Sequence, residues 1–185
     1  MRIKVSLAIF AAAIAAAQDV PIDTARSTIT IHVGKAGLLS AAGHEHWVNA
    51  PISSGSIDQS ALRVNFTVES AKMAVKPDPK VDAKTQAQIQ KDMEQMTLET
   101  SKFPEIMFRS SKIEKTGEDW KVEGTLSLHG VTKPVVVMVK RSGDGYAAKT
   151  MLKQTDFGIK PVSVGGGAVK VKNEIELEFA IFPKK

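Results

Sequence analysis

Apolar and polar residues alternate with a period of two over most of the chain, as is typical of strands that bury one face. The clearest apolar sets are Ile29, Ile31 and Val33; Val64, Phe66 and Val68; Val122, Leu126 and Leu128; and Ile175, Leu177, Phe179 and Ile181. Short stretches rich in Gly, Asp and Ser separate these runs at 117–119, 142–145 and 165–167. The pattern predicts antiparallel strands joined by turns, in a barrel or a sandwich, of which we favour the barrel.

The stretch 129–139 departs from simple alternation. Gly130 permits the backbone angles of a tight turn, and Pro134 restarts an extended strand. From Pro134 to Val139 the chain is apolar on both faces. Because strands with two apolar faces are usually covered on both, we expect something beyond the barrel interior to cover part of this strand. His129, at the start of the turn, has a mainly structural role in this interpretation.

One segment, 82–99, has the period of an amphipathic helix instead. It contains neither Gly nor Pro, and Ile89, Met93 and Met96 recur at i, i+4 and i+7. Asp82 is the candidate N-cap. A single helix inserted between barrel strands is expected to plug or cover an opening. The flexible side chains of Met93 and Met96 would suit a lid over a long ligand, although such a stripe also suits a protein core.

The first 17 of the 185 residues are predicted to be a signal peptide that is cleaved after Ala17. Arg2 and Lys4 precede an apolar run from Val5, and small residues follow it. The run is shorter than the roughly 20 residues that cross a bilayer, so an uncleaved membrane anchor is the weaker alternative. We therefore expect an exported, periplasmic protein with a single domain over 18–185.

Cysteine is absent, which excludes a thiol nucleophile, a thiolate metal site and a lipoprotein anchor. Without Arg2 and Lys4, the 25 basic residues fall to 23, against 20 acidic ones. Acidic and basic residues interleave along the chain, which indicates a solvated surface and no nucleic-acid partner.

No familiar catalytic motif is present: the chain lacks a G-x-S-x-G elbow, a phosphate-binding loop, an H-E-x-x-H pair and a G-x-G-x-x-G turn. Most carboxylates fall on polar strand faces, and no acid/base pair can be named. We therefore predict that the protein is not an enzyme and has no catalytic residue, metal or cofactor.

The sequence most suggestive of a metal-binding or ligand-binding site is Gly-His-Glu-His-Trp at 43–47. In an extended strand, His44 and His46 project to the same side, about 6–7 Å apart. They could share a metal ion, hydrogen-bond the polar head of a ligand, or be structural. A catalytic zinc usually needs a third protein ligand, and the sequence identifies none.

Several segments together resemble the YceI-like family of periplasmic polyisoprenoid-binding proteins. They are Ile22-Asp23 with Ser27, Ile29 and Ile31; Phe103-Pro104-Glu105-Ile106-Met107-Phe108-Arg109-Ser110; Gly124-Thr125-Leu126-Ser127-Leu128-His129-Gly130-Val131-Thr132-Lys133-Pro134; and Thr155-Asp156-Phe157-Gly158-Ile159. Their order and spacing cover nearly the whole mature chain. The resemblance implies an extended, eight-stranded antiparallel lipocalin-like barrel that holds an amphiphile with a long isoprenoid tail.

On this basis we predict that the protein binds, carries or sequesters an isoprenoid lipid such as a polyprenyl quinone. The predicted ligand contacts are Ile29, Ile31, Val33, His44, His46, Met93, Met96, Phe108, Leu126 and Leu128. Two alternatives stay open: a metal-binding protein or metal-dependent enzyme that uses His44 and His46, and a structural or stress-related module with a filled core. Periodicity alone does not distinguish a packed barrel from a hollow one. A homodimer and a transient contact with the membrane surface also stay open.

Overall fold

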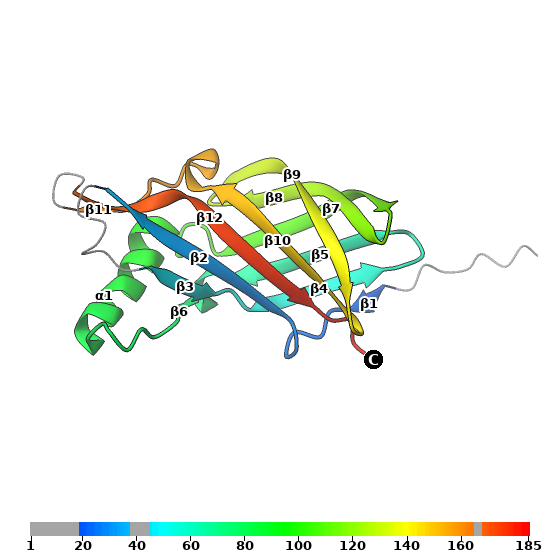
Figure 1. Cartoon of the computed structure of the whole chain (residues 1–185), viewed down its shortest axis with the longest axis horizontal. Coiled ribbons are helices and arrows are strands. Elements are labelled where there is room, and N and C mark those ends of the chain that lie inside the picture. The colour runs from blue at the N-terminus through cyan, green and yellow to red at the C-terminus, as the bar shows by residue number, and fades with distance from the viewer. Residues whose placement is uncertain (1–18, 38–44, 165–167) are drawn as a thin grey trace, which may run out of the picture.

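The computed structural model describes residues 19–37, 45–164 and 168–185, which form one curled antiparallel sheet and a helix (Figure 1). The strands are β1 (Val20–Pro21), β2 (Thr28–Ala36), β3 (His46–Asn49), β4 (Ile52–Asp58), β5 (Arg63–Glu69), β6 (Ala74–Val75), β7 (Glu105–Thr116), β8 (Asp119–Leu128), β9 (Val131–Ser142), β10 (Gly145–Lys153), β11 (Ser163–Val164) and β12 (Val169–Ile181). The predicted all-β class with one inserted helix is confirmed. The described residues form twelve strands, however: eight have 7 to 13 residues, and four have only 2 to 4.

Three sequence predictions fall outside the described residues: the signal peptide at 1–17, His44 and the glycine turn at 165–167. In the part of the chain that the structure describes, no helix is long and apolar enough to cross a membrane.

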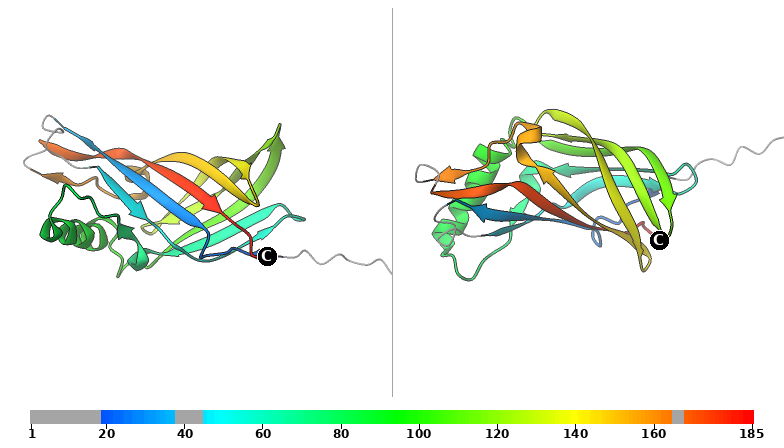
Figure 2. Two further views of the ribbon diagram at one scale, coloured as in Figure 1. Left: turned by 60° about the horizontal axis from the view of Figure 1, so that its bottom comes forward. Right: turned by 45° about the horizontal axis from the view of Figure 1, so that its top comes forward.

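The strands pair in the order β1-β4-β5-β7-β8-β9-β10-β12-β2-β3-β6, with β11 attached to β12. The residues after β1 tie this end of the sheet back to β12. Ile22 forms a bridge with Pro183, and the Asp23 N–H donates to the Phe182 carbonyl at 2.8 Å. The same segment bonds to β4, where the Ile22 N–H donates to the Gly55 carbonyl at 2.9 Å. The sheet therefore curls until the N-terminal segment joins β4 to the end of β12 (Figure 2).

The wall is least regular between β9 and β10. These strands pair only near their hairpin, as far as Val139 and Ala148, and then diverge (Figure 1). Three large apolar side chains near the divergence are exposed. On β9 they are Val136, with 52% of its surface exposed, and Met138, with 43%; on β10 it is Met151, with 56%. The outer apolar face of β9 is thus largely exposed among the described residues, and the expectation that something covers part of it stays a prediction.

The predicted helix begins at its predicted cap. The Asp82 carboxylate accepts the Thr85 N–H at 3.0 Å, and α1 extends over Ala83–Asp92. A π-helical turn, η3 (Met93–Thr97), follows directly. No residue of α1 is buried, and the helix is held to β6 chiefly by Gln90, whose side-chain amide bonds the Val75 N–H and the Met73 carbonyl. The helix covers the end of the barrel remote from the C-terminus (Figure 1).

A two-residue turn joins β8 to β9 at His129 and Gly130, as the sequence indicates. Both residues have positive φ, 52° and 74°, which is the geometry of a type I′ hairpin turn. His129 is held there by three contacts: Nε2 lies 2.7 Å from a Glu99 carboxylate oxygen, Nδ1 lies 3.3 Å from the Phe157 carbonyl, and the ring lies 4.4 Å from that of Phe103. This network links the turn to η4 (Gln154–Phe157) and to the segment after the helix.

Gly124 lies at a close approach between backbone and side chain in the wall. It lies on β8 opposite a β-bulge of β7, between Ser110 and Lys112. A Cβ atom at Gly124 would lie 2.5 Å from the Arg109 carbonyl oxygen and 2.7 Å from the Phe108 ring. Glycine is therefore needed here to let the ring of Phe108 lie flat against the strand.

Gly124→Ala should destabilise the protein by about 1–3 kcal/mol, because the added methyl overpacks a site bounded by backbone. Urea unfolding, followed by far-UV circular dichroism, measures this change. Thr125→Ala, at the neighbouring exposed position, is the matched control and should stay within about 0.5 kcal/mol of the parent protein. Equal stability of Gly124→Ala and the control would show that Phe108 can move freely.

Candidate functional site

Two cavities lie end to end inside the barrel. The outer cavity, about 330 Å³, lies toward the β4–β5 and β9–β10 hairpins, and the inner cavity, about 150 Å³, lies toward the helix. Apolar side chains from β4, β5, β7, β8, β9, β10 and β12 line most of the outer cavity. The volume of the outer cavity is within the range of ordinary ligand pockets.

A belt of three phenylalanines divides the two cavities. Phe66, Phe108 and Phe179 come from β5, β7 and β12 and contribute to the lining of both. The ring centroids of Phe66 and Phe108 lie 5.3 Å apart, and those of Phe66 and Phe179 lie 6.4 Å apart. Contacts at such distances each stabilise by roughly 0.5–1.5 kcal/mol beyond area burial. Among the described residues, Val137 also lines both cavities.

Polar groups gather at the mouth of the outer cavity. Gln59 and Arg63 come from the β4–β5 hairpin, and Arg141 and Tyr146 from the β9–β10 hairpin. The Tyr146 hydroxyl receives hydrogen bonds from Gln59 Nε2 at 3.4 Å and from an Arg141 guanidinium N–H at 3.3 Å. The bond from Gln59 joins the two hairpins across the mouth.

Asp58 also lines the outer cavity, but its carboxylate serves the hairpin. Its side chain has no exposed surface. One oxygen accepts the Ala61 N–H at 2.8 Å and the Ser60 hydroxyl at 2.7 Å, and the other accepts from Arg63 at 3.1 Å. The Ala61 N–H, followed by the Ser60 hydroxyl, lowers the pKa of Asp58 to about 2. Asp58 is therefore ionised and fully engaged, with no free oxygen for a ligand or a proton transfer.

The inner cavity is closed at the helix end by residues of the last motif quoted above. Phe157 and Ile159 are 2% and 4% exposed and line this cavity. Gln154, three residues before Phe157, is also buried, and its amide donates to the Lys172 carbonyl at 2.8 Å. This bond fixes η4 against β12, so the inner end is plugged by structure that is itself anchored.

The structure brings most of the predicted contact residues together. Six of them line the inner cavity alone, Ile29, Ile31, Val33, Met93, Leu126 and Leu128, and Phe108 lines both cavities. Met96 lines neither and is 71% exposed. The π-turn explains this, because the Leu98 N–H donates to the Met93 carbonyl five residues earlier. Leu98, at 8% exposure, therefore occupies the inward place that a regular helix would give to Met96.

The histidine pair is only partly described, since His44 lies outside the described residues. His46 pairs with Val33 across β2 and β3, so it lies on the inner face of the sheet, yet it lines neither cavity. Within 19–37, 45–164 and 168–185, no three His, Cys, Asp or Glu side chains are grouped as a metal site requires. The metal-binding interpretation of His44 and His46 stays a prediction.

The sequence analysis missed the outer cavity. Its distinctive residues are Ile113, Trp120, Val139, Arg141, Tyr146 and Ala148. The period-two pattern could have found some of them, since Val135, Val137, Val139 and Arg141 fall in one phase of β9. The sequence signal for the mouth of this cavity was Arg141, a charged residue at the end of a set of inward-facing valines.

The fold and interior define a class of protein, an antiparallel barrel whose apolar interior is open toward one set of hairpins and closed at the other end by the turns η3 and η4. The chain matches the model of the YceI-like domain over residues 21–182 and belongs to this family.

Two relatives support the assignment, one over nearly the whole chain and one over about a third of it. A UPF0312 protein of Shewanella oneidensis is 27% identical over 187 residues, covering 94% of this chain and 93% of the relative. Protein YceI of Escherichia coli is 37% identical over 73 residues, or 34% of this chain and 38% of its own.

Two solved structures share the fold. BcnA of Burkholderia cenocepacia aligns with a TM-score of 0.57 at 17% identity, over 86% of this chain and 98% of its own. A polyisoprenoid binding domain from Saccharophagus degradans, implicated in plant cell wall breakdown, aligns with the same score at 14% identity, over 87% and 95%.

Asp58→Asn should lower the free energy of unfolding at pH 7, because the neutral amide accepts the hairpin hydrogen bonds more weakly than the carboxylate. Since the pKa of Asp58 in the folded protein is about 2, below its value in the unfolded chain, its contribution is complete above about pH 4. It is lost as the pH falls from about 4 toward 2.

Urea titrations of both proteins between pH 7 and pH 2 measure the difference, which should shrink only below about pH 4. Glu118→Gln, in the exposed β7–β8 turn, is the control and should show little difference at any pH. A difference for Asp58→Asn that is constant down to pH 2 would contradict this account.

Proposed function

We propose that this protein binds an amphiphile with an isoprenoid tail and carries or sequesters it, without catalysing a reaction. The single observation that carries the proposal is the outer cavity, an apolar space of about 330 Å³ with polar groups only at its mouth. A module with a filled core has no need of such a space. The family membership and the fold shared with the polyisoprenoid binding domain of Saccharophagus degradans support an isoprenoid as the tail.

The energetics of burial favour a tail of modest buried length. Each CH₂ group removed from water contributes about 0.8 kcal/mol, so one five-carbon isoprene unit contributes roughly 3–4 kcal/mol. The ordering and association costs of binding offset part of this sum, and a few buried units suffice for tight retention. The outer cavity would receive these first units, with the remainder of a longer tail directed toward the phenylalanine belt.

A longer tail needs the belt to open. The inner cavity continues the apolar lining beyond Phe66, Phe108 and Phe179, and Met93 borders it from the helix side. Phenyl rings reorient about two side-chain torsions, and methionine is flexible and adapts to irregular shapes. We infer that the tail enters from the hairpin end and reaches the inner cavity when the rings turn aside.

The chemistry of the lining supports a binding role over catalysis. Among the described residues, Asp58 is the one carboxylate that borders the outer cavity, and its oxygens accept hydrogen bonds from the hairpin. A general acid or base needs a group free to exchange a proton with the substrate.

Export to the periplasm is part of the same proposal and rests on the sequence of residues 1–17. Purified from its host, the protein should have the mass of a chain that begins at Gln18.

Filling the outer cavity should weaken binding without unfolding the barrel. Ala148 is half-buried on β10 and lines this cavity, so Ala148→Phe places a ring in the proposed path of the tail. Met151→Phe adds the same ring three residues later, on the exposed outer face, and is the matched control. We expect Ala148→Phe to weaken binding of an isoprenoid quinone at least about tenfold, the loss of a few buried CH₂ groups, and Met151→Phe to leave it unchanged.

Tryptophan fluorescence provides the measurement. The chain has two tryptophans, of which Trp120 lines the outer cavity and Trp47 is exposed on β3. In a Trp47→Phe background, a quinone with a two-unit tail should quench Trp120 saturably. Native mass spectrometry of protein purified gently from its host should then identify the natural cargo. Absence of saturable quenching together with a bare protein mass would refute the proposed function.

A further inference from the structure

The polar mouth of the outer cavity presents hydrogen-bond donors in excess of acceptors. Three charged side chains border the cavity, Asp58, Arg63 and Arg141. Asp58 and Arg63 bond each other at 3.1 Å, and this pair belongs to the hairpin. Arg141 has no carboxylate partner among the described residues; its guanidinium donates to the Gly143 carbonyl at 3.1 Å and to the Tyr146 hydroxyl at 3.3 Å. One positive charge at the mouth is therefore not compensated.

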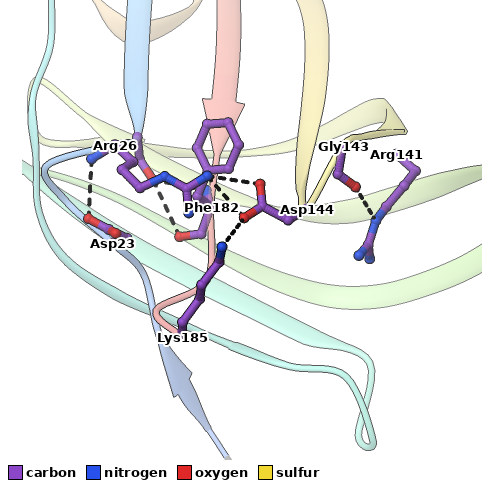
Figure 3. A network of polar contacts seen from close by, with 8 residues as sticks. Asp23, Arg26, Arg141, Gly143, Asp144, Phe182 and Lys185 are labelled. Atoms are coloured by element: carbon purple, nitrogen blue, oxygen red, sulfur yellow. Dashed lines mark hydrogen bonds and ion pairs between the residues drawn. The ribbon is translucent and has the colours of Figure 1, made fainter.

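The acidic residue nearest to Arg141 in the hairpin, Asp144, is engaged elsewhere (Figure 3). Arg26 donates to both of its carboxylate oxygens, at 2.8 and 3.0 Å, and Lys185 lies 3.4 Å from one of them. The Arg26 hydrogen bond lowers the pKa of Asp144 to about 2, so this pair persists at neutral pH. Arg26 also lies over the Phe182 ring, at 4.4 Å. Asp144 is thus held by Arg26 and Lys185 and leaves the charge of Arg141 available.

Tyr146 adds a second donor at the same place. Its hydroxyl oxygen already receives hydrogen bonds from Gln59 and Arg141, so the hydroxyl proton is left to donate to a further acceptor. The ring of Tyr146 is held edge-on against Trp120, with centroids 5.7 Å apart, and the Arg141 guanidinium lies 5.2 Å from its centre. The donors are therefore held in place from two sides.

We propose that the mouth is a subsite for an anionic head group, a carboxylate or phosphate, at the end of the apolar tail, with Arg141 and the Tyr146 hydroxyl as its donors. This inference rests on the proposed function, which places the tail in the outer cavity. An anion at the edge of a low-dielectric cavity gains a charge-assisted hydrogen bond, roughly twice as strong as a neutral one. Arginine suits both carboxylate and phosphate because its planar guanidinium can donate to two oxygens at once.

The test compares two ligands that share one tail. Farnesoic acid is ionised at pH 7, whereas its methyl ester is neutral, and both can be titrated against Trp120 fluorescence in the Trp47→Phe background. We expect the acid to bind about tenfold to a hundredfold more tightly than the ester, as a hydrogen bond to a charged group implies. Arg141→Gln should reduce this ratio to near one, mainly by weakening the acid. Tyr146→Phe should reduce it in part.

Arg109→Gln is the matched control. Arg109 is an exposed arginine on β7 that lines neither cavity, so its removal changes the net charge equally and should leave the ratio intact. A similar loss in both variants would mean that overall charge, and not the mouth, attracts the acid, and would overturn the proposal.

Two further outcomes separate the head-group subsite from its alternatives. If inorganic phosphate at millimolar concentration displaces the acid but not the ester, the mouth is a site for free anions and the assignment to a lipid head group fails. If acid and ester bind equally in the parent protein, the anionic subsite is refuted while the proposed function stands. If neither ligand binds, both are refuted.

Discussion

The backbone ladder of the barrel wall is the interaction on which the other features depend. Each long strand satisfies its amides and carbonyls by pairing with its neighbours, and the segment around Ile22 joins the β4 side of the sheet to the end of β12. Ile22 is 2% exposed, and Gly55 on β4 makes room for it, since a Cβ there would lie 2.8 Å from the Ile22 side chain. A wall closed in this way holds its shape without a completely filled interior.

The same ladder determines which side chains meet inside. Directly paired residues lie on one face, so Ile31 with Val48 and Phe66 with Phe108 project together toward the interior. A slip of one residue would exchange inner and outer faces along a whole strand. The bulges in β7 and β4 each shift the inward phase by one residue, so that Ile113 as well as Phe108 on β7 faces the interior, whereas the irregularity in β12 keeps the phase. The belt of three phenylalanines is a product of this register, because its members come from strands far apart in the chain.

The sequence was most informative where a regular period applied. The alternation identified the inward faces of β2 and β8, and the cap at Asp82 located the start of α1. It was less informative where local geometry broke the period. The π-turn moved Met96 outward and Leu98 inward, and no simple periodicity signals such a turn. The outer cavity escaped prediction for another reason: whether inward side chains fill a barrel depends on its diameter, which the pattern along one strand does not reveal.

Tail and head group then make different contributions to recognition. An apolar lining discriminates poorly between tails, because one methylene more or less changes binding by only about 1–3 kcal/mol. Polar groups in a desolvated site discriminate more sharply, since a ligand that cannot pair with them leaves them unsatisfied. In this barrel the lining extends across many residues, but the donors are confined to two hairpins, around Arg63 and around Arg141 and Tyr146. Changes in those hairpins can therefore alter the choice of ligand while the ladder, and with it the interior that holds the tail, stays the same.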